Sequence, residues 1–454
     1  MDSASLYDVA VVGGGLAGTT LVAELALVAP PDFRVLLIDA GEPGPGSAYA
    51  PASDALFMNG PARAMSATAA DKEELLRWLG SQDREALIPR RLFGRYLAER
   101  FARALAGRPL FDAIRSEVVD LEPDAGGFRI LDARGDEWSA RCAVLALGNF
   151  PPDDSFLPEA LRSSRGFVSN PWTFDPRKAT GDVLVVGGGL TALDAVAQLD
   201  ERGFSGTIHI VSRHGLLPHV ENPAARALDR SALDLKTQTP LALLRSLRAA
   251  VRRHAAAGGD WREVLESIRE ISQEIWGGWS QRERRRFLEH LQAFWTAHRY
   301  RVPPATASVF ERLDRAGRIV RHRGRVAAAR ALRDGRLSVE IANAACTTVV
   351  AIASAINCTG PNGDYARIRH ALVRNLVRRG LLRPDPLHLG LDANDELRVL
   401  DRRGAPSERL FAIGPPLRGL FYETTAVPET ARQAARLAQA LAQEPSASAL
   451  EAAS

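Results

Sequence analysis

A short glycine-rich segment near the N-terminus constrains the fold more than any other feature of the chain. The apolar, β-branched run 8–12 leads into Gly13-Gly14-Gly15-Leu16-Ala17-Gly18, and an apolar helix is expected to follow to about Ala29. A second apolar run, 34–38, ends at Asp39. Strand, glycine turn, helix and strand in this order predict a βαβ unit with a dinucleotide-binding fingerprint.

Each glycine of this fingerprint has a separate expected role. Gly13 permits the tight turn, Gly15 lets the backbone approach a pyrophosphate, and Gly18 lets the helix pack closely on the strand. The diphosphate would lie at the helix N-terminus, where free N–H groups and the helix dipole favour negative charge. Asp39 stands where a carboxylate accepts hydrogen bonds from a ribose.

The same unit recurs in the middle of the chain. The apolar run 182–186 leads into Gly187, Gly189 and Ala192, and a second strand is expected at 207–211. Ser212 and Arg213 stand where the first unit has its acid. An acid would repel a 2′-phosphate, whereas a serine–arginine pair receives one. The second unit is therefore predicted to bind NADPH, with NADH as the alternative.

Both units continue through a strand-rich stretch that ends in a glycine turn, at Gly148 in the first and Gly360 in the second. A third strand ends at Gly414, and an alanine-rich helix is expected to begin near Pro428. The second unit is longer because it contains a segment rich in Leu, Ala, Arg and Glu at helical spacing, about 240–301. We consider that insertion a candidate roof for a substrate pocket.

These elements predict an α/β fold with two Rossmann-like dinucleotide-binding domains and a helical insertion in the second. The first domain is expected to take residues 1–170 and to return as 363–454. The second domain is expected to take 171–362, including the insertion at about 240–301. The first would bind FAD and the second NAD(P)H, an assignment that rests on the resemblance described below.

Composition excludes several other classes of protein. Charged residues make up 25% of the chain and the net charge is +4, but arginines and acids alternate, which argues against nucleic-acid binding. No apolar stretch is long enough to span a membrane, and the N-terminus lacks the pattern of a signal peptide. The expectation is a soluble cytoplasmic protein without membrane or nucleic-acid partners; the sequence does not set its oligomeric state.

The cysteine pattern removes further classes. The three cysteines, Cys142, Cys346 and Cys358, are far apart and form neither a C-x-x-C pair nor a metal-ligand spacing. A disulfide scaffold, a metal site and a dithiol reductase are therefore not expected.

Six shorter segments add to the two tandem units: 46–49, 58–66, 89–96, 212–218, 356–361 and 422–428. With them, the chain resembles the two-dinucleotide-binding-domain flavoproteins along nearly its whole length. More narrowly, it resembles the bacterial FAD/NAD(P)-binding family that includes an FAD-dependent urate hydroxylase and amino-acid N-monooxygenases such as the aspartate N-monooxygenase. Residues 57–61, Phe-Met-Asn-Gly-Pro, depart from the Leu-Leu-Asn-Val-Pro usual there, and this change is expected near the flavin.

The resemblance implies further site residues. Ala48, Tyr49, Met65 and Ser66 are expected beside FAD, and so are Thr424 and Thr425 at the end of the chain. Asn59, Arg63 and Arg299 are the candidates for contact with substrate. An anionic substrate favours a bidentate arginine, and Arg63 and Arg299 are the first candidates for that role.

The resemblance also implies an FAD- and NAD(P)H-dependent monooxygenase that uses O2 and a C4a-hydroperoxyflavin to hydroxylate a small anionic molecule. Urate hydroxylation to 5-hydroxyisourate, a step of purine metabolism, is placed first. Amino-acid N-hydroxylation with an aspartate-like substrate is the close alternative. An NADPH dehydrogenase that passes electrons to a partner is the second class of enzyme left open, and a non-catalytic FAD-binding module is the third reading.

The 2′-phosphate assignment is tested by Arg213→Glu. A charged hydrogen bond contributes about 1.5–3 kcal/mol, so the variant is expected to raise the KM for NADPH roughly ten- to a hundred-fold while sparing NADH. Steady-state kinetics with both nucleotides measures this. An equal effect on the two nucleotides would remove the assignment.

Overall fold

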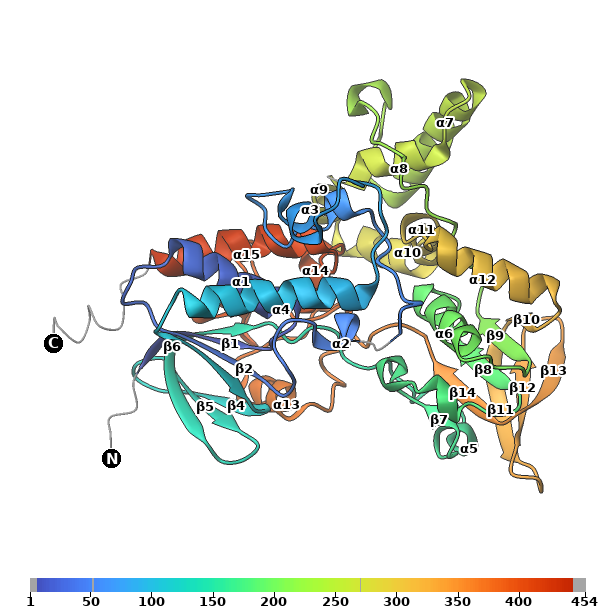
Figure 1. Ribbon diagram of the computed structural model, residues 1–454, viewed down its shortest axis with the longest axis horizontal. Coiled ribbons are helices and arrows are strands. Elements are labelled where there is room, and N and C mark those ends of the chain that lie inside the picture. The colour runs from blue at the N-terminus through green and yellow to red at the C-terminus, as the bar shows by residue number, and fades with distance from the viewer. Residues whose placement is uncertain (1–5, 51–52, 270, 444–454) are drawn as a thin grey trace.

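The computed structural model describes residues 6–50, 53–269 and 271–443 of the chain. Two parallel sheets with helices packed on them lie side by side, and a helical arm projects from the body (Figure 1). The first and last long elements of the described chain, β1 (Tyr7–Val12) and α15 (Val427–Ala442), both belong to the half that holds the first sheet. The α/β class expected from the sequence is confirmed.

The first sheet is built from both ends of the chain. Its main path runs β15-β16-β6-β1-β2-β3, all parallel except for β15, and β5 joins the antiparallel β4 to β6. The late strands β15 and β16 thus extend a sheet begun at the N-terminus. The strands are β1 (Tyr7–Val12), β2 (Val35–Asp39), β3 (Phe111–Arg115), β4 (Val118–Pro123), β5 (Phe128–Asp132), β6 (Glu137–Leu145), β15 (Arg398–Leu400) and β16 (Pro406–Ala412).

Three long helices cover one face of this sheet: α1 (Leu16–Val28), α4 (Arg90–Ala106) and α15 (Val427–Ala442) (Figure 1). The central strands β1 and β2 are apolar on both faces, as expected for buried parallel strands. Short helices connect the long elements around this sheet: α2 (Gly46–Tyr49), α3 (Glu74–Leu79), α13 (Ala371–Arg379) and α14 (Arg418–Phe421).

The second sheet has the all-parallel order β10-β9-β8-β14-β7. Alternate residues of β8 face opposite sides: Val183 and Val185 pack under α6 and α12, whereas Leu184 and Val186 pack against a three-stranded antiparallel sheet. The elements are β7 (Phe167–Val168), β8 (Val183–Val186), α6 (Leu190–Glu201), β9 (Ile208–Ser212), α12 (Pro304–Arg315), β10 (Ile319–Arg323), β11 (Arg325–Ala331), β12 (Leu337–Ala342), β13 (Thr347–Ile352) and β14 (Ser354–Asn357), with α5 (Glu159–Arg162) beside β11.

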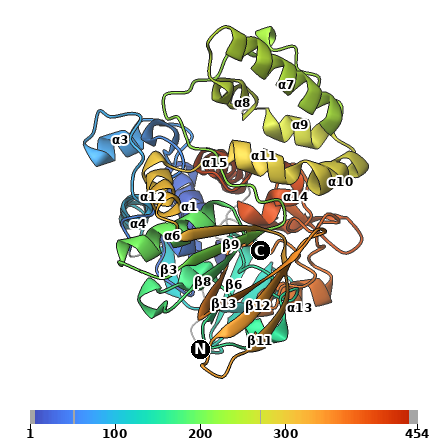
Figure 2. The same cartoon turned by 90° about the vertical axis from the view of Figure 1, so that its right-hand side faces the viewer.

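The segment 240–301 forms five helices: α7 (Pro240–Ala256), α8 (Trp261–Arg269), α9 (Ser272–Gly278), α10 (Gln281–His290) and α11 (Gln292–Arg299). Figure 2 shows α7 and α8 standing above α10 and α11. Trp276 and Trp279 are buried in their common core, as packing residues. The Tyr422 ring also belongs to that core and stacks on Trp276 at 4.7 Å.

Direct contacts join the two halves of the molecule. The Arg90 guanidinium, on α4, pairs with the Asp194 carboxylate of α6 at 2.8 Å, and both side chains are nearly buried. The Ser53 hydroxyl donates to Glu201, at the end of the same helix.

Among the described residues, no helix is both long and apolar enough to cross a bilayer. The domain limits drawn from the sequence stay a prediction.

A buried ion pair between α1 and α4 is expected to carry stability. Arg100 of α4 donates to Glu24 of α1 at 2.7 Å, and both side chains are under 9% exposed. Because truncation leaves a buried charge unpaired, Arg100→Ala is expected to destabilise the protein by about 3–5 kcal/mol.

Urea unfolding of the purified protein measures this loss. Arg103, on the same helix and 63% exposed in its side chain, supplies the control: Arg103→Ala is expected to change stability by about 0.5 kcal/mol or less. Equal effects of the two substitutions would contradict the role assigned to the buried pair.

Candidate functional site

The first glycine turn lies between β1 and α1, as the sequence predicts. A Cβ on Gly13, whose φ is +110°, would lie 2.3 Å from the carbonyl oxygen of Ala146, and a Cβ on Gly18 would lie 1.8 Å from that of Gly13. These two glycines are required by close backbone approach. Gly15 differs, because a Cβ there meets nothing nearer than Gly46 at 3.7 Å. Its side-chain position opens onto the N-terminus of α1.

Asp39 and the segment after it hold this turn in place. The Asp39 carboxylate accepts hydrogen bonds from the backbone N–H groups of Gly14 (2.5 Å) and Gly41 (2.6 Å). The next residues form α2, which contains Ala48 and Tyr49, and the Tyr49 ring packs on Phe93 at 4.9 Å. The residues predicted to bind FAD, Asp39, Ala48 and Tyr49, therefore lie at the end of β2 and on the helix α2 that follows it.

The second glycine turn repeats this geometry between β8 and α6. A Cβ on Gly187 would lie 2.2 Å from the carbonyl oxygen of Cys358, whereas a Cβ on Gly189 has no neighbour within 4 Å. Ala192 is buried at the base of α6. Ser212 ends β9 and its hydroxyl accepts a hydrogen bond from the N–H of Gly215. Arg213 is exposed beside it, and no ion pair to it occurs within the described residues.

The three closing turns have left-handed backbone at glycine: φ is +65° at Gly148, +95° at Gly360 and +77° at Gly414. The Thr424 hydroxyl donates to the Gly414 carbonyl at 3.0 Å and accepts from Gln433 of α15. The Thr424 side chain is therefore saturated by the fold, while its neighbour Thr425 is exposed beside the N-terminus of α15.

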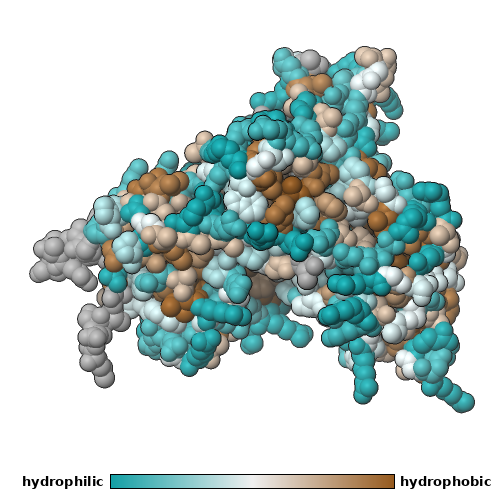
Figure 3. Space-filling model, viewed as in Figure 1, coloured by the Kyte–Doolittle hydropathy of each residue, from teal (hydrophilic) through white to brown (hydrophobic). Residues whose placement is uncertain are grey.

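A cleft that is open to solvent lies where the two halves of the molecule and the insertion meet. The loop 59–65, the segment after β9, the helices α8 and α11, and the N-terminus of α15 all contribute to it. On the face shown in Figure 3, one of several apolar patches lies between α3 and α11. Side chains that line the cleft include Asn59, Arg63, Met65, Glu221, Asn222, Glu266, Arg269, Arg299, Tyr300, Arg301 and Thr425.

The structure thus brings Asn59, Arg63, Met65, Arg299 and Thr425 together, although they come from three distant parts of the chain. Ser66 is next to this group but buried, and its hydroxyl donates to the Asp71 carbonyl. Ser212 and Arg213 do not line the cleft; they belong to the second glycine turn.

Arg299 is held by a buried carboxylate. Its Nε and one Nη donate to the two oxygens of Glu423 at 3.1 and 3.0 Å, and the two side chains are 9% and 3% exposed. Burial acts to lower the pKa of Arg299, but Glu423, Tyr300 and Glu266 outweigh it and raise the pKa. The guanidinium is permanently charged and already makes a bidentate contact with Glu423. The bidentate contact that was predicted with a substrate is therefore made within the protein.

Arg63 is similarly engaged. Its Nε lies 3.1 Å from both carboxylate oxygens of Glu85, and one Nη donates to the carbonyl of Pro223 at 3.2 Å. The roles assigned to Arg63 and Arg299 in substrate contact stay predictions, but neither guanidinium is open.

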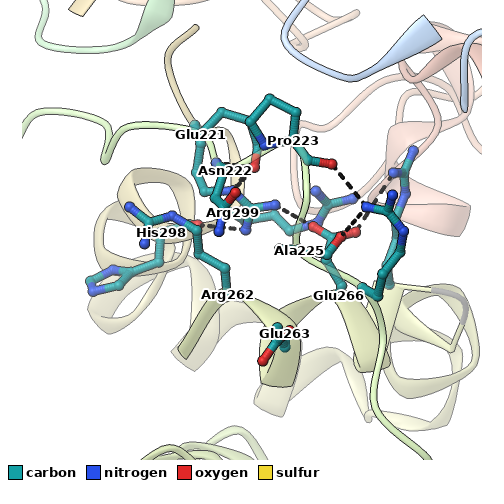
Figure 4. Close-up of polar contacts among 12 residues, drawn as sticks. Glu221, Asn222, Pro223, Ala225, Arg262, Glu263, Glu266, His298 and Arg299 are labelled. Carbon is teal, nitrogen blue, oxygen red and sulfur yellow. Dashed lines mark hydrogen bonds and ion pairs between the residues drawn. The ribbon is translucent and has the colours of Figure 1, made fainter. Parts of the chain in front are cut away.

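Sequence reasoning missed Glu221, Asn222, Glu266 and Arg269. Arg301, which is 2% exposed, lies between the carboxylates of Glu221 (3.0 Å) and Glu266. Burial acts to raise the pKa of Glu266, but the guanidiniums of Arg299, Arg301 and Arg269 together hold it below its usual range. Figure 4 shows the segment 221–225 above the helix that carries Glu266. The side chains of His298 and Glu263 point away from the contacts drawn between that segment and the arginines.

Arg269 differs from the other arginines of the cleft. Its nearest carboxylate oxygens, on Glu266 and Glu429, are each 3.9 Å away, beyond hydrogen-bond distance. Its side chain is 20% exposed and lines the cleft. No local signal marks it, because arginine and glutamate recur at helical spacing throughout the insertion.

The geometry of both glycine turns fits a bound dinucleotide. The N-caps of α1 and α6, Gly15 and Gly189, have no side-chain cap hydrogen bond, and neither helix has an acid in its first turn. The N–H groups and dipoles of both helices are therefore available to a diphosphate, at positions where a glycine Cα leaves room for it. FAD and NAD(P)H would supply hydride-transfer and oxygen chemistry when bound.

The fold thus contains two βαβ units, each with a glycine turn that fits a dinucleotide. Residues 10–150 match the model of the FAD-NAD(P)-binding family, so the chain contains an FAD/NAD(P)-binding domain. The resemblance and the cofactor class inferred from the sequence are confirmed at this level. A comparison with curated protein sequences found no match.

Solved structures share the fold along most of the chain. The L-lysine 6-monooxygenase of Pseudomonas syringae is 17% identical with a TM-score of 0.62, covering 96% of this chain and 100% of that one. The ornithine hydroxylase of Pseudomonas aeruginosa is 17% identical (TM-score 0.61; 97% and 99% covered). The bacillithiol disulfide reductase of Bacillus cereus is 15% identical (TM-score 0.57; 96% and 99% covered).

The predicted roles of Gly15 in FAD binding and of Gly189 in NADPH binding are tested by replacing each glycine with valine. Because a side chain at Gly15 or Gly189 meets no close neighbour in the protein, both valine variants are expected to fold. Gly15→Val is expected to lose bound FAD, since valine occupies the approach of the pyrophosphate. Gly189→Val is expected to keep FAD but to be reduced at least tenfold more slowly by low NADPH concentrations.

Absorbance after gel filtration measures FAD content, and stopped-flow reduction measures the NADPH step. Stoichiometric FAD in Gly15→Val, or normal NADPH dependence in Gly189→Val, would show that the corresponding glycine is only structural.

Proposed function

We propose that this protein is an FAD- and NADPH-dependent monooxygenase that hydroxylates the nitrogen of a small amino compound. The cleft is the observation that carries the proposal, because it joins the loop 59–65 and the N-terminus of α15 to charged residues of both signs from the insertion. The reaction is R–NH2 + O2 + NADPH + H+ → R–NHOH + NADP+ + H2O.

The residues of the cleft suit that reaction in two ways. The buried pairs formed by Arg299 and Arg301 close its wall without leaving unpaired charge. Among the described residues, the Asn59 side chain makes no hydrogen bond within the protein, so its amide is available to orient a polar substrate or the nicotinamide. Positioning a reactant is the main contribution that a protein makes to flavin chemistry.

The cysteines argue against dithiol chemistry. Cys142 is buried in β6 of the first sheet and Cys358 is buried directly after β14 of the second. Burial, with a contribution from the Asp194 carboxylate, raises the pKa of the Cys358 thiol. Among the described residues the cysteines form no disulfide, and the exposed Cys346 lies on the turn between β12 and β13. The disulfide-reductase neighbours are therefore a weaker guide to this chain than the hydroxylases.

The choice of substrate class follows the neighbours. Several similar structures are hydroxylases or monooxygenases of ornithine, lysine or cadaverine, all of which carry a primary amine. This supports N-hydroxylation over the urate hydroxylation placed first from the sequence, for which the comparisons give no support.

The test is NADPH oxidation by the FAD-loaded protein with L-aspartate, L-ornithine, L-lysine, cadaverine and urate, together with assays for hydroxylamine and hydrogen peroxide. One amine is expected to accelerate oxidation at least about tenfold and to yield about one hydroxylamine per NADPH. Formation of 5-hydroxyisourate would select the urate reaction instead. An NADPH dehydrogenase would be favoured if NADPH rapidly reduced an added dye, no candidate substrate accelerated this, and all the consumed oxygen were recovered as hydrogen peroxide.

A further inference from the structure

Charge pairing sets one arginine of the cleft apart. Arg63, Arg299 and Arg301 each donate hydrogen bonds to a carboxylate at 3.0–3.1 Å. Arg269 makes no side-chain hydrogen bond within the described residues, and its two nearest carboxylate oxygens are both at 3.9 Å. A guanidinium has five N–H donors in a planar fork, so Arg269 offers the cleft unused donor capacity.

We propose, on the basis of the N-hydroxylase function above, that Arg269 binds the carboxylate of the substrate and so selects amino acids over simple amines. The side chain lines the cleft and is only 20% exposed, so a charge-assisted bidentate contact there is largely shielded from water.

The surroundings of Arg269 suit exchange of partners. Glu266 is already hydrogen-bonded to Arg301, and Glu429 is an ion-pair partner of Arg432 at 3.2 Å. Both carboxylates therefore keep another cation when Arg269 turns toward a ligand. Their charges hold the guanidinium near the cleft without using its directional bonds, which leaves those bonds for a substrate.

The location of Arg269 gives the contact a consequence for chemistry. It lies on α8, while Asn59 and Thr425 line the same cleft from other parts of the chain. A carboxylate fixed on the insertion would leave the rest of an amino acid extending toward the loop 59–65 and the N-terminus of α15. Arg269 is thus a specificity-determining residue that binds the carboxylate at the end of the substrate opposite the reacting nitrogen.

The experiment compares each amino acid with its decarboxylated analogue: ornithine with putrescine, lysine with cadaverine, and aspartate with β-alanine, which keeps one carboxylate. Kd is measured by thermal-shift titration of the FAD-loaded protein, and KM and kcat by hydroxylamine formation. The wild-type protein is expected to bind the acid member of its preferred pair about ten- to a hundred-fold more tightly.

Arg269→Ala is expected to raise the Kd and KM for that amino acid by the same factor, leaving the decarboxylated analogue and the rate of flavin reduction by NADPH unchanged. Arg269→Lys keeps the charge but loses the fork and is expected to recover only part of the affinity. Arg286→Ala, which removes a half-exposed arginine of α10, is the control and is expected to change nothing.

The outcomes separate this inference from the proposed function. Binding that depends on Arg269 without hydroxylamine formation would support the carboxylate site and overturn the N-hydroxylase. Hydroxylamine formation with equal affinity for both members of a pair, or with no response to Arg269→Ala, would overturn the carboxylate site and keep the enzyme. Failure of every carboxylate probe to bind would also overturn the site.

Discussion

Close approach of backbone to backbone at the two glycine turns is the constraint on which the rest of the structure depends. Gly18 packs on the carbonyl of Gly13, and Gly13 on that of Ala146, so β1, α1 and β6 meet with no side chain between them. The second sheet repeats this between Gly187 and Cys358. Because the strands are parallel, both helices then direct their N-termini toward the carboxyl edge of their sheet, which is where ligands of such folds bind.

The insertion completes what the two sheets begin. Its helix α9 docks on the corner that precedes α15, where Trp276 stacks on Tyr422 and donates to the Gly419 carbonyl at 2.8 Å. Tyr422 has φ of +58°, unusual for a residue with a side chain, and this packing holds it there. Together with the Arg299–Glu423 pair, the contact fixes α11 against the N-terminus of α15. The roof of the cleft is therefore tied to the first domain.

Much of this architecture could be predicted from the sequence because its signals are local. Each βαβ unit is a contiguous pattern of apolar runs and glycines, and the segment 240–301 has helical spacing throughout. The state of the arginines could not be predicted in this way. Arg299 finds its partner 124 residues away, and Arg63 reaches a carbonyl 160 residues away. Such pairings depend on how the insertion docks, which no local pattern records.

The same physics explains why the obvious arginines are poor candidates for recognition. A guanidinium that is under a tenth exposed must be paired, since an isolated buried charge is very costly. Arg299 and Arg301 therefore keep their partners whether or not a substrate is present. A recognition residue needs the opposite balance: enough burial to strengthen its contact, and a resting environment that attracts its charge but leaves its donors unused. Among the arginines of this cleft, the one held at 3.9 Å from two otherwise paired carboxylates meets both conditions.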